Sequence, residues 1–395
     1  MSKTICSLVA AVGFLCLAPG PAHGADAPKF LGANSCSASS CHGGGGQNQN
    51  QFLAWSLKDF HSQRPAATLT TARSKQIAAA LDIKTPATDA RCTACHAPLN
   101  QVPENRRGEN YKISEGVSCE SCHGPAENWL RAHTRTDWTH ADRTVAGMRD
   151  LQNLYVRANT CVACHQNVDS DILAAGHPEL IFELDGQSVA EPKHWRAEKN
   201  GNGVQAWLVG QAVALREMSW QLSREKSPTE NQINRWRGLI WLTHRARQIE
   251  PSLPAPLDIT FRPNTENFEL VQKWSDDLAI AVAKLSWTDK LSQESLAVLA
   301  NTSVDFSEAV PQPVNARRAE RLVLALDRLV TALPELKKNE PVQSALNQLF
   351  KLAQSIPDFD SVKFAAALAD FSRAVAQADP TVMLNATPAS IPSRP

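Results

Sequence analysis

Eight of the ten cysteines fall into four pairs, and a histidine directly follows the second cysteine of each pair. In three pairs two residues separate the cysteines, which gives the pattern Cys-x-x-Cys-His. Thiols in this pattern add to the vinyl groups of a haem, and the adjacent histidine is then held against one face of the iron. The sequence therefore predicts four covalently bound haem c groups. The pairs and their histidines are Cys36, Cys41 and His42; Cys92, Cys95 and His96; Cys119, Cys122 and His123; and Cys161, Cys164 and His165.

Two other uses of paired cysteines explain this pattern less well. Disulfide bonds suit an oxidising compartment, but they leave the four adjacent histidines without a reason. Cys-x-x-Cys is also half of a zinc site, yet a zinc site joins two halves and needs no histidine directly after each pair. We therefore favour haem over both alternatives.

The first pair departs from the usual spacing, because four residues separate Cys36 from Cys41. A longer loop can bulge outward and still present both sulfur atoms to one porphyrin. The alternative is a disulfide between these two cysteines beside an unbound His42. We expect a haem, because His42 occupies the position that the pattern requires. The glycines at 43–46 indicate a flexible loop and no phosphate site, since neither a strand nor a Lys-Ser/Thr pair follows them.

The N-terminal segment has the features of a secretory signal peptide. One lysine, Lys3, precedes an apolar run over residues 5–17, and small residues follow up to Gly24. The run is too short to span a bilayer as a helix. We expect cleavage after residue 24 and therefore an exported, periplasmic protein that does not span the membrane.

Six further histidines follow the predicted cleavage site, and five of them lie before residue 200, in the same half of the chain as the cysteine pairs. Imidazole is a suitable ligand for iron, so these residues are candidates for the second axial position of each haem. Methionine is scarce, with four residues in the whole chain. The pattern thus favours haems held mostly by two histidines. The candidates are His61, His133, His140, His177, His194 and His244.

Several segments together resemble the tetrahaem cytochrome c-554 family. They are CSASSCHGG, WSLKDFHS, CTACHA, GVSCESCHGPAENWLRAH and CVACHQ, and they cover about residues 30–195. The best-known member of that family accepts electrons from hydroxylamine oxidoreductase. The resemblance implies an electron carrier, with His133 as second ligand of the haem on His42 and His61 as second ligand of the haem on His123.

The resemblance leaves the remaining two haems less defined. A histidine well after the fourth pair completes the fourth haem in that family, and both His177 and His194 fit this description here. We assign His194 to the haem on His165, although the reverse assignment is open. The second haem has an open face in the family, which corresponds to the haem on His96. We expect His177 to close that face, with His140 in reserve.

Beyond these motifs, the chain divides into parts of different composition. Residues 25–200 contain scattered glycine and proline, which indicates a haem domain with little regular structure. Residues 201–378 read as an α-helical bundle, so the fold class is mainly α. Apolar periodicity predicts helices at about 265–285, 288–301, 314–334, 340–355 and 359–377, and Ser227 is the expected N-cap of an earlier helix. Residues 379–395 read as a disordered tail.

The charge balance does not favour nucleic-acid binding, and two functions remain under consideration. Forty basic and forty acidic residues balance, which gives no indication of nucleic-acid binding. The favoured function is an electron carrier between redox partner proteins, which requires no substrate pocket. The alternative is a haem oxidoreductase or small-ligand binder that uses an open-faced haem on His96 for nitrogen oxide chemistry. The helical bundle is expected to pack on the haem domain or to dock a partner or a second copy of the chain.

Overall fold

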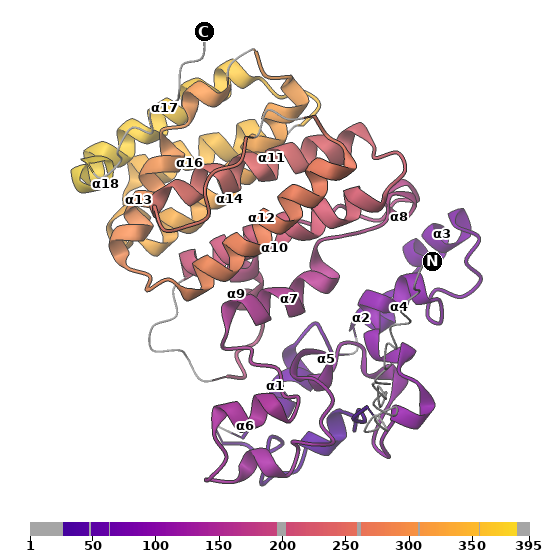
Figure 1. Cartoon of the computed structure of the whole chain (residues 1–395). Coiled ribbons are helices and arrows are strands. Elements are labelled where there is room, and N and C mark those ends of the chain that lie inside the picture. Colours follow the sequence, from indigo (N-terminus) through magenta and orange to yellow (C-terminus); the bar gives the residue numbers. More distant parts are fainter. Residues whose placement is uncertain are drawn as a thin grey trace, which may run out of the picture.

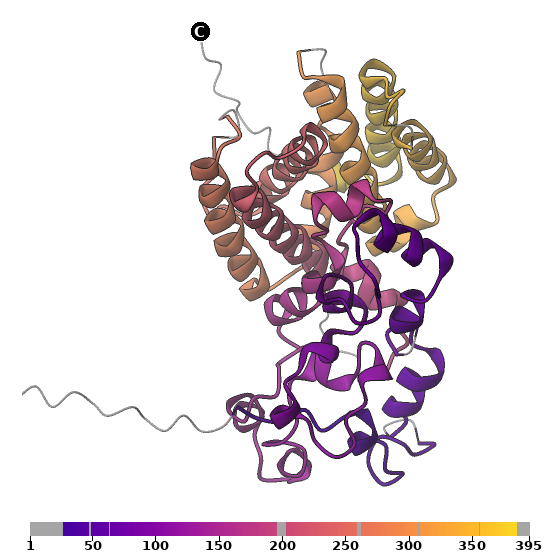
Figure 2. The same ribbon diagram turned by 90° about the vertical axis from the view of Figure 1, so that its right-hand side faces the viewer.

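The computed structural model describes residues 27–46, 49–62, 64–195, 203–258, 262–306, 309–354 and 356–384. The predicted signal peptide, residues 1–24, lies outside the described residues. The fold is mainly helical, as the sequence predicts. Figure 1 shows a region of short helices below and a bundle of longer helices above, and the turned view of Figure 2 shows the same division.

The first region is built from short helices joined by turns. Its α-helices are α1 Gln51–Lys58, α2 Arg64–Thr68, α3 Ala72–Ala80, α4 Ala90–His96, α5 Cys119–His123, α6 His140–Val145, α7 Leu154–His165, α8 Ser170–Ala174 and α9 Leu184–Ala190. One 3-10 turn precedes them, η1 Ala33–Cys36, and others lie between them: η2 Pro98–Gln101, η3 Glu104–Arg106, η4 Ile113–Glu115 and η5 Ala132–Thr134.

The second region contains the long helices. They are α10 Gly203–Arg224, α11 Glu230–Ala246, α12 Thr265–Lys284, α13 Asp289–Ala300, α14 Gln312–Ala332, α16 Glu340–Ala353 and α17 Ser361–Ala378, with the shorter α15 Pro334–Lys337, α18 Pro380–Leu384, η6 Arg247–Ile249 and η7 Ser303–Phe306. The five helices predicted from apolar periodicity correspond to α12, α13, α14, α16 and α17, within two residues at each end.

Two local predictions in this region are wrong. Helix α11 is capped by Thr229, whose hydroxyl accepts from the backbone N–H of Gln232, and not by Ser227. The sequence offers two overlapping capping boxes, and the second is used because Gln232 is then buried against the bundle. Residues 380–384 of the predicted tail form α18, because the apolar side chain of Val382 is buried in the core.

The bundle encloses a continuous apolar core. Its largest buried side chains include Trp207, Trp236, Trp241, Phe306 and Phe364. Helix α10 lies at the centre of the packing, since it contacts α11, α12 and α14 within the bundle and α7 and α9 from the first region. No helix among the described residues is both long and apolar enough to cross a membrane.

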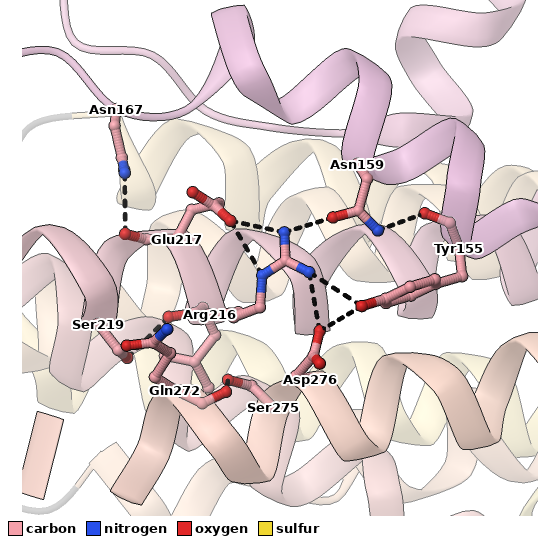
Figure 3. A network of polar contacts seen from close by, with 10 residues as sticks. Tyr155, Asn159, Asn167, Arg216, Glu217, Ser219, Gln272, Ser275 and Asp276 are labelled. Carbon is pink, nitrogen blue, oxygen red and sulfur yellow. Dashed lines mark hydrogen bonds and ion pairs between the residues drawn. The ribbon is translucent and has the colours of Figure 1, made fainter. Parts of the chain in front are cut away.

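Helix α7 connects the two regions. Ala158 and Val162 on α7 are buried in the same connected core as the bundle helices. A polar network covers this contact (Figure 3), in which Arg216 of α10 donates to Asp276 of α12 at 2.8 Å and also bonds Asn159 of α7. The bundle therefore holds the helix that carries the fourth cysteine pair.

Candidate haem-binding site

Three of the four cysteine pairs lie at the C-terminal ends of helices, in α4, α5 and α7. Cysteines three positions apart on a helix share one face, so both thiols point to the same side and the following histidine lies beside them. Polar residues begin these helices: Asp89 and Asn153 accept backbone N–H groups at the start of α4 and α7, and at the start of α5 the backbone N–H of Ser118 donates to the hydroxyl of Ser121.

The first pair, with its longer spacing, lies in a closed loop. The backbone N–H of His42 donates to the carbonyl of Cys36 at 3.3 Å, and that of Cys41 donates to Ala38 at 2.8 Å. The four-residue insertion is therefore folded into a turn. This brings both cysteines to the position of His42, as a haem would require.

The thiols of different pairs lie beside one another. Cys36 lies close enough to Cys119, and Cys95 to Cys164, for each thiol to affect the pKa of the other. Cys122 and Cys161 are also neighbours, close enough to influence each other electrostatically. The pairs thus form a connected series in the order first, third, fourth and second.

Two buried glutamates join the first pair to the third. Glu120 lies between Cys119 and Cys122, and its carboxylate accepts from the backbone of Leu31 at 2.8 Å and Gly32 at 2.7 Å. Glu115 accepts from the backbone N–H of Ala33. Burial raises the pKa of both carboxyl groups. We did not predict these two buried glutamates, which act as braces between the first and third pairs. The only sign of them in the sequence is the position of Glu120 between the two cysteines of the third pair.

Three histidine pairs face each other at a spacing that suits one iron between them. The ring centroids are 6.1 Å apart for His42 and His133, 6.0 Å for His61 and His165, and 6.4 Å for His96 and His177. An atom bound at roughly 2 Å by two imidazole nitrogens separates the ring centroids by roughly 6.2 Å. The spacing in each pair therefore fits axial ligation of a single metal.

No ring contact of His123 with a second histidine is found among the described residues. Burial, and then the nearby charges of His194, His42, Arg149 and His133, lower the pKa of His123 to about 4. The Nδ1 atom of His123 is buried and has no hydrogen-bond partner among the described residues. His42 and His133 already form a pair with each other, so we interpret His194 as the candidate partner of His123.

The other ring nitrogen of the candidate ligands is held by hydrogen bonds. A metal-binding histidine normally bonds a carbonyl or carboxylate through the nitrogen that does not bind the metal. Six of the eight candidates show such a contact at Nδ1, which leaves Nε2 free to bind iron. The partners are Gln51 for His42 (3.0 Å), Asp59 for His61 (3.2 Å), Pro65 for His96 (3.1 Å), Trp129 for His133 (3.1 Å), Pro178 for His177 (2.9 Å) and Pro192 for His194 (3.1 Å).

Two carboxylates support neighbouring ligands. Asp59, His61 and Glu191 bring ligand atoms within 4.8 Å of one another. The hydrogen bond to Asp59 raises the pKa of His61, while a carboxylate oxygen of Glu191 lies 3.7 Å from Nδ1 of His194. Because these contacts use the Nδ1 atoms, we interpret the group as support for two haem ligands and not as a separate metal site.

The structure arranges two of the expected ligand pairs differently. His133 lies beside His42 and His177 beside His96, which are the neighbours that the predicted ligand pairs require. In contrast, the ring of His61 lies beside that of His165, whereas we predicted that His61 would pair with His123. The backbone of His61 does lie beside the third pair, since Val117 donates to its carbonyl at 2.9 Å, but Asp59 orients the ring toward α7.

A close backbone approach makes this arrangement possible. Gly116, just before the third pair, has a φ of +69°, and a Cβ atom there would lie 1.9 Å from the carbonyl oxygen of Ser62. The glycine therefore allows the His61 segment to pack directly on the start of α5. With His61 beside His165, His194 is left as the candidate ligand for the iron on His123.

Two histidines remain outside these pairs. His140, the reserve candidate, is 59% exposed and directs Nε2 toward Asp150 at 3.0 Å. His244 is in α11 of the bundle, where burial lowers its pKa. Neither residue is brought to a cysteine pair by the contacts that the structure shows.

Cavities and charges near the pairs also fit haem. A cavity of about 590 Å³ is lined by Leu69, Ala97, Arg107 and Tyr111, close to His96. A second, of about 430 Å³, lies between α1 and the segment before His194, with Lys58 and Lys193 in its wall. Cavities of this size hold small cofactors, and the basic side chains are suited to pair with haem propionates.

Cys-to-His motifs, three of them with a second histidine ring about 6 Å from the first, are typical of a c-type cytochrome. Residues 35–124 match the family described as cytochrome c554 and c-prime. The matched segment is thus similar to a c-type cytochrome, and that family implies covalently bound haem c and electron transport. The match includes the first three cysteine pairs and ends before the fourth. Searches of curated proteins and of solved structures found no match to the chain.

Proposed function

We propose that the mature chain is an exported, periplasmic cytochrome that carries four covalently bound haems and passes electrons between redox partner proteins. The observation that carries the proposal is the pairing of six histidines, whose three pairs have ring centroids 6.0–6.4 Å apart. When bound, haem supplies reversible one-electron chemistry.

The cysteines would fix each haem, and the histidines would hold its iron from both sides. Burial lowers the pKa of His96 and of His165, which keeps these imidazoles neutral and able to bind metal. The Nδ1 hydrogen bonds fix the ring orientations before any change of redox state. Such fixed ligands favour rapid electron transfer with little movement of the protein.

The ligand pairs we propose are His42 with His133, His96 with His177, His123 with His194, and His165 with His61. Under this arrangement each haem has two histidine ligands. The ring of His177 opposite His96 argues against the alternative, a nitrogen oxide site on an open-faced haem. Redox partners would then exchange electrons at haem edges and would need no substrate pocket.

Intact mass spectrometry of the mature protein tests the number of haems. We expect the mass of residues 25–395 plus four haems, including one on Cys36 and Cys41. A mass with three haems and an oxidised Cys36–Cys41 pair would contradict the proposal for the first site.

The new ligand pairing needs a separate test, for which we suggest the variants H194A and C161A/C164A/H194A. If His194 binds the iron on His123, electron paramagnetic resonance should show one high-spin ferric haem in both variants. If His194 instead binds the iron on His165, the signal should disappear when the fourth haem is removed. The variant C161A/C164A is the matched control for loss of the fourth haem.

A further inference from the structure

One segment supplies two of the proposed distal ligands and is docked on the helical bundle. This segment, residues 177–194, is called the strap below; it begins at His177, includes α9 and ends at His194. Phe182 and Leu184 of the strap are completely buried in the bundle core. Gly210 of α10 lets the strap approach closely, because a Cβ atom there would lie 2.8 Å from that of Leu184.

Two buried arginines of the bundle hold the strap just after His177. Arg317 of α14 contacts a carboxylate oxygen of Glu179 at 3.0 Å, and its side chain is 8% exposed. Arg235 of α11 is equally buried and donates to the carbonyl of Leu180 at 2.7 Å. Asn231 of α11 also donates to Glu179. The chain is therefore fixed at two consecutive residues, only two positions from the ligand.

The contacts on the opposite side of His177 are more exposed. Arg73 of α3 donates to the carbonyl of Gly176 at 2.8 Å in an exposed hydrogen bond. Arg91 of α4 pairs with Asp171, with side chains 36% and 55% exposed. Solvent screens such surface pairs, whereas the guanidinium groups of Arg235 and Arg317 are only 8% exposed and would be costly to leave without a partner. The bundle is thus the firmer of the two attachments.

We propose that the bundle positions His177: Arg235 and Arg317, acting through Glu179 and Leu180, keep this histidine opposite His96. This assigns a role to the helical region that the matched family segment, residues 35–124, does not contain. The inference rests on the proposed function, because it assumes that His96 and His177 bind the same iron. Arg235 and Arg317 are positioning residues, since they do not contact the ligand ring.

The test measures how readily the reduced protein binds carbon monoxide, which requires an iron with a free axial position. The apparent affinity for such a ligand scales with the population of the open form. We expect R317Q, and more strongly R235Q/R317Q, to increase carbon monoxide binding at least about tenfold over the wild type, limited to one haem per chain. The variant H177A gives the reference for one fully open haem.

The matched control is R245Q. Arg245 of α11 is also largely buried and forms an ion pair with Asp305 at 2.5 Å, but this pair lies within the bundle and away from the strap. We expect R245Q to bind no more carbon monoxide than the wild type, even if it lowers the melting temperature as much as R317Q does. Equal binding by R245Q and R317Q would contradict a positioning role.

Two further outcomes separate this inference from the proposed function. If the wild type already binds carbon monoxide at one haem, the proposed ligand pair itself is contradicted. If the wild type and folded R235Q/R317Q both bind none while H177A binds one equivalent, only the positioning role is overturned. If R235Q/R317Q does not fold, E179Q can be used instead, because Glu179 is about a third exposed and its substitution is less disruptive. Carbon monoxide binding by folded E179Q equal to that of the wild type would also overturn the positioning role.

Discussion

The two regions of the molecule are stabilised in different ways. In the bundle, long helices enclose a connected core that begins at Ala158 in the sequence and extends to Val382. Before residue 158, the described residues contain only eight buried apolar side chains, and none of them joins that core. They are Ala33, Leu69, Ala78, Ala97, Leu99, Val102, Ala126 and Trp129.

The comparison shows what each region needs in order to fold. Burial of apolar side chains can stabilise the bundle without any cofactor. The first region has helices of five to twelve residues, which are marginal on their own. It depends on braces such as Glu120 and, in our account, on haems that replace the missing core.

The largest expected effect follows from removing all eight motif cysteines by substitution with alanine. Without thioether bonds, we expect residues 27–150 to be digested rapidly by protease, while residues from about 203 to 384 remain resistant. The change should be visible as two separate regions in limited proteolysis followed by mass spectrometry, with the holoprotein as control. Equal resistance of both regions in the variant would contradict the comparison.

A core substitution sharpens the comparison within the bundle. Leu278 and Leu270 are both on α12, but the first is completely buried and the second is 47% exposed. We expect L278A to reduce the free energy of unfolding by about 2–5 kcal/mol, because it leaves a cavity. L270A should change it by less than about 0.5 kcal/mol. Chemical denaturation followed by circular dichroism distinguishes the two; similar losses would mean that α12 packs differently.

Glu183 predicts a pH dependence at the junction of the two regions. Burial raises its pKa to about 7, an effect that Arg321 reduces and Asp185 increases. The folded protein therefore binds this proton more tightly than the unfolded chain. Its stabilising contribution is complete below about pH 4.5 and is lost as the pH rises through 7.

The variant E183Q tests this contribution. We compare the free energy of unfolding of E183Q with that of the wild type at each pH. The advantage of E183Q should be larger at pH 8 than at pH 4.5, by up to roughly 3 kcal/mol. Denaturation curves of both proteins across this range give the difference directly. A difference between variant and wild type that does not change with pH would show that Glu183 titrates at its ordinary value.

The smallest expected effect concerns the network between α7 and the bundle. Asp276 accepts from Arg216 at 2.8 Å and from the hydroxyl of Tyr155 at 2.7 Å. We expect D276N to reduce the free energy of unfolding by about 0.5–1.5 kcal/mol. The neighbouring D277N is the control, because the ion pair of Asp277 with Lys273 is exposed. Indistinguishable variants would mean that the network adds little to the attachment of α7.

Local features of the sequence predicted much of this structure. Apolar periodicity located α12, α13, α14, α16 and α17, because each buries one face against the same core. The start of α11 was missed by two residues, since Ser227 and Thr229 both suit an N-cap and only tertiary burial of Gln232 selects between them.

The candidate site was predictable where its chemistry is local. Each cysteine pair and its proximal histidine are adjacent in the chain, so their grouping can be seen without a fold. The distal partner depends on the path of the chain. The backbone of His61 lies next to the third pair, but its ring lies next to that of His165. The contact with Asp59 and the close approach at Gly116 set this orientation, and neither can be seen in the sequence.

The most direct test of the central claim is electron paramagnetic resonance of the oxidised wild-type protein, quantified against its haem content. If every haem is held by two histidines, all four should give low-spin ferric signals, and the reduced protein should bind no nitric oxide. A persistent high-spin signal equal to one haem per chain, together with nitric oxide binding after reduction, would contradict the account.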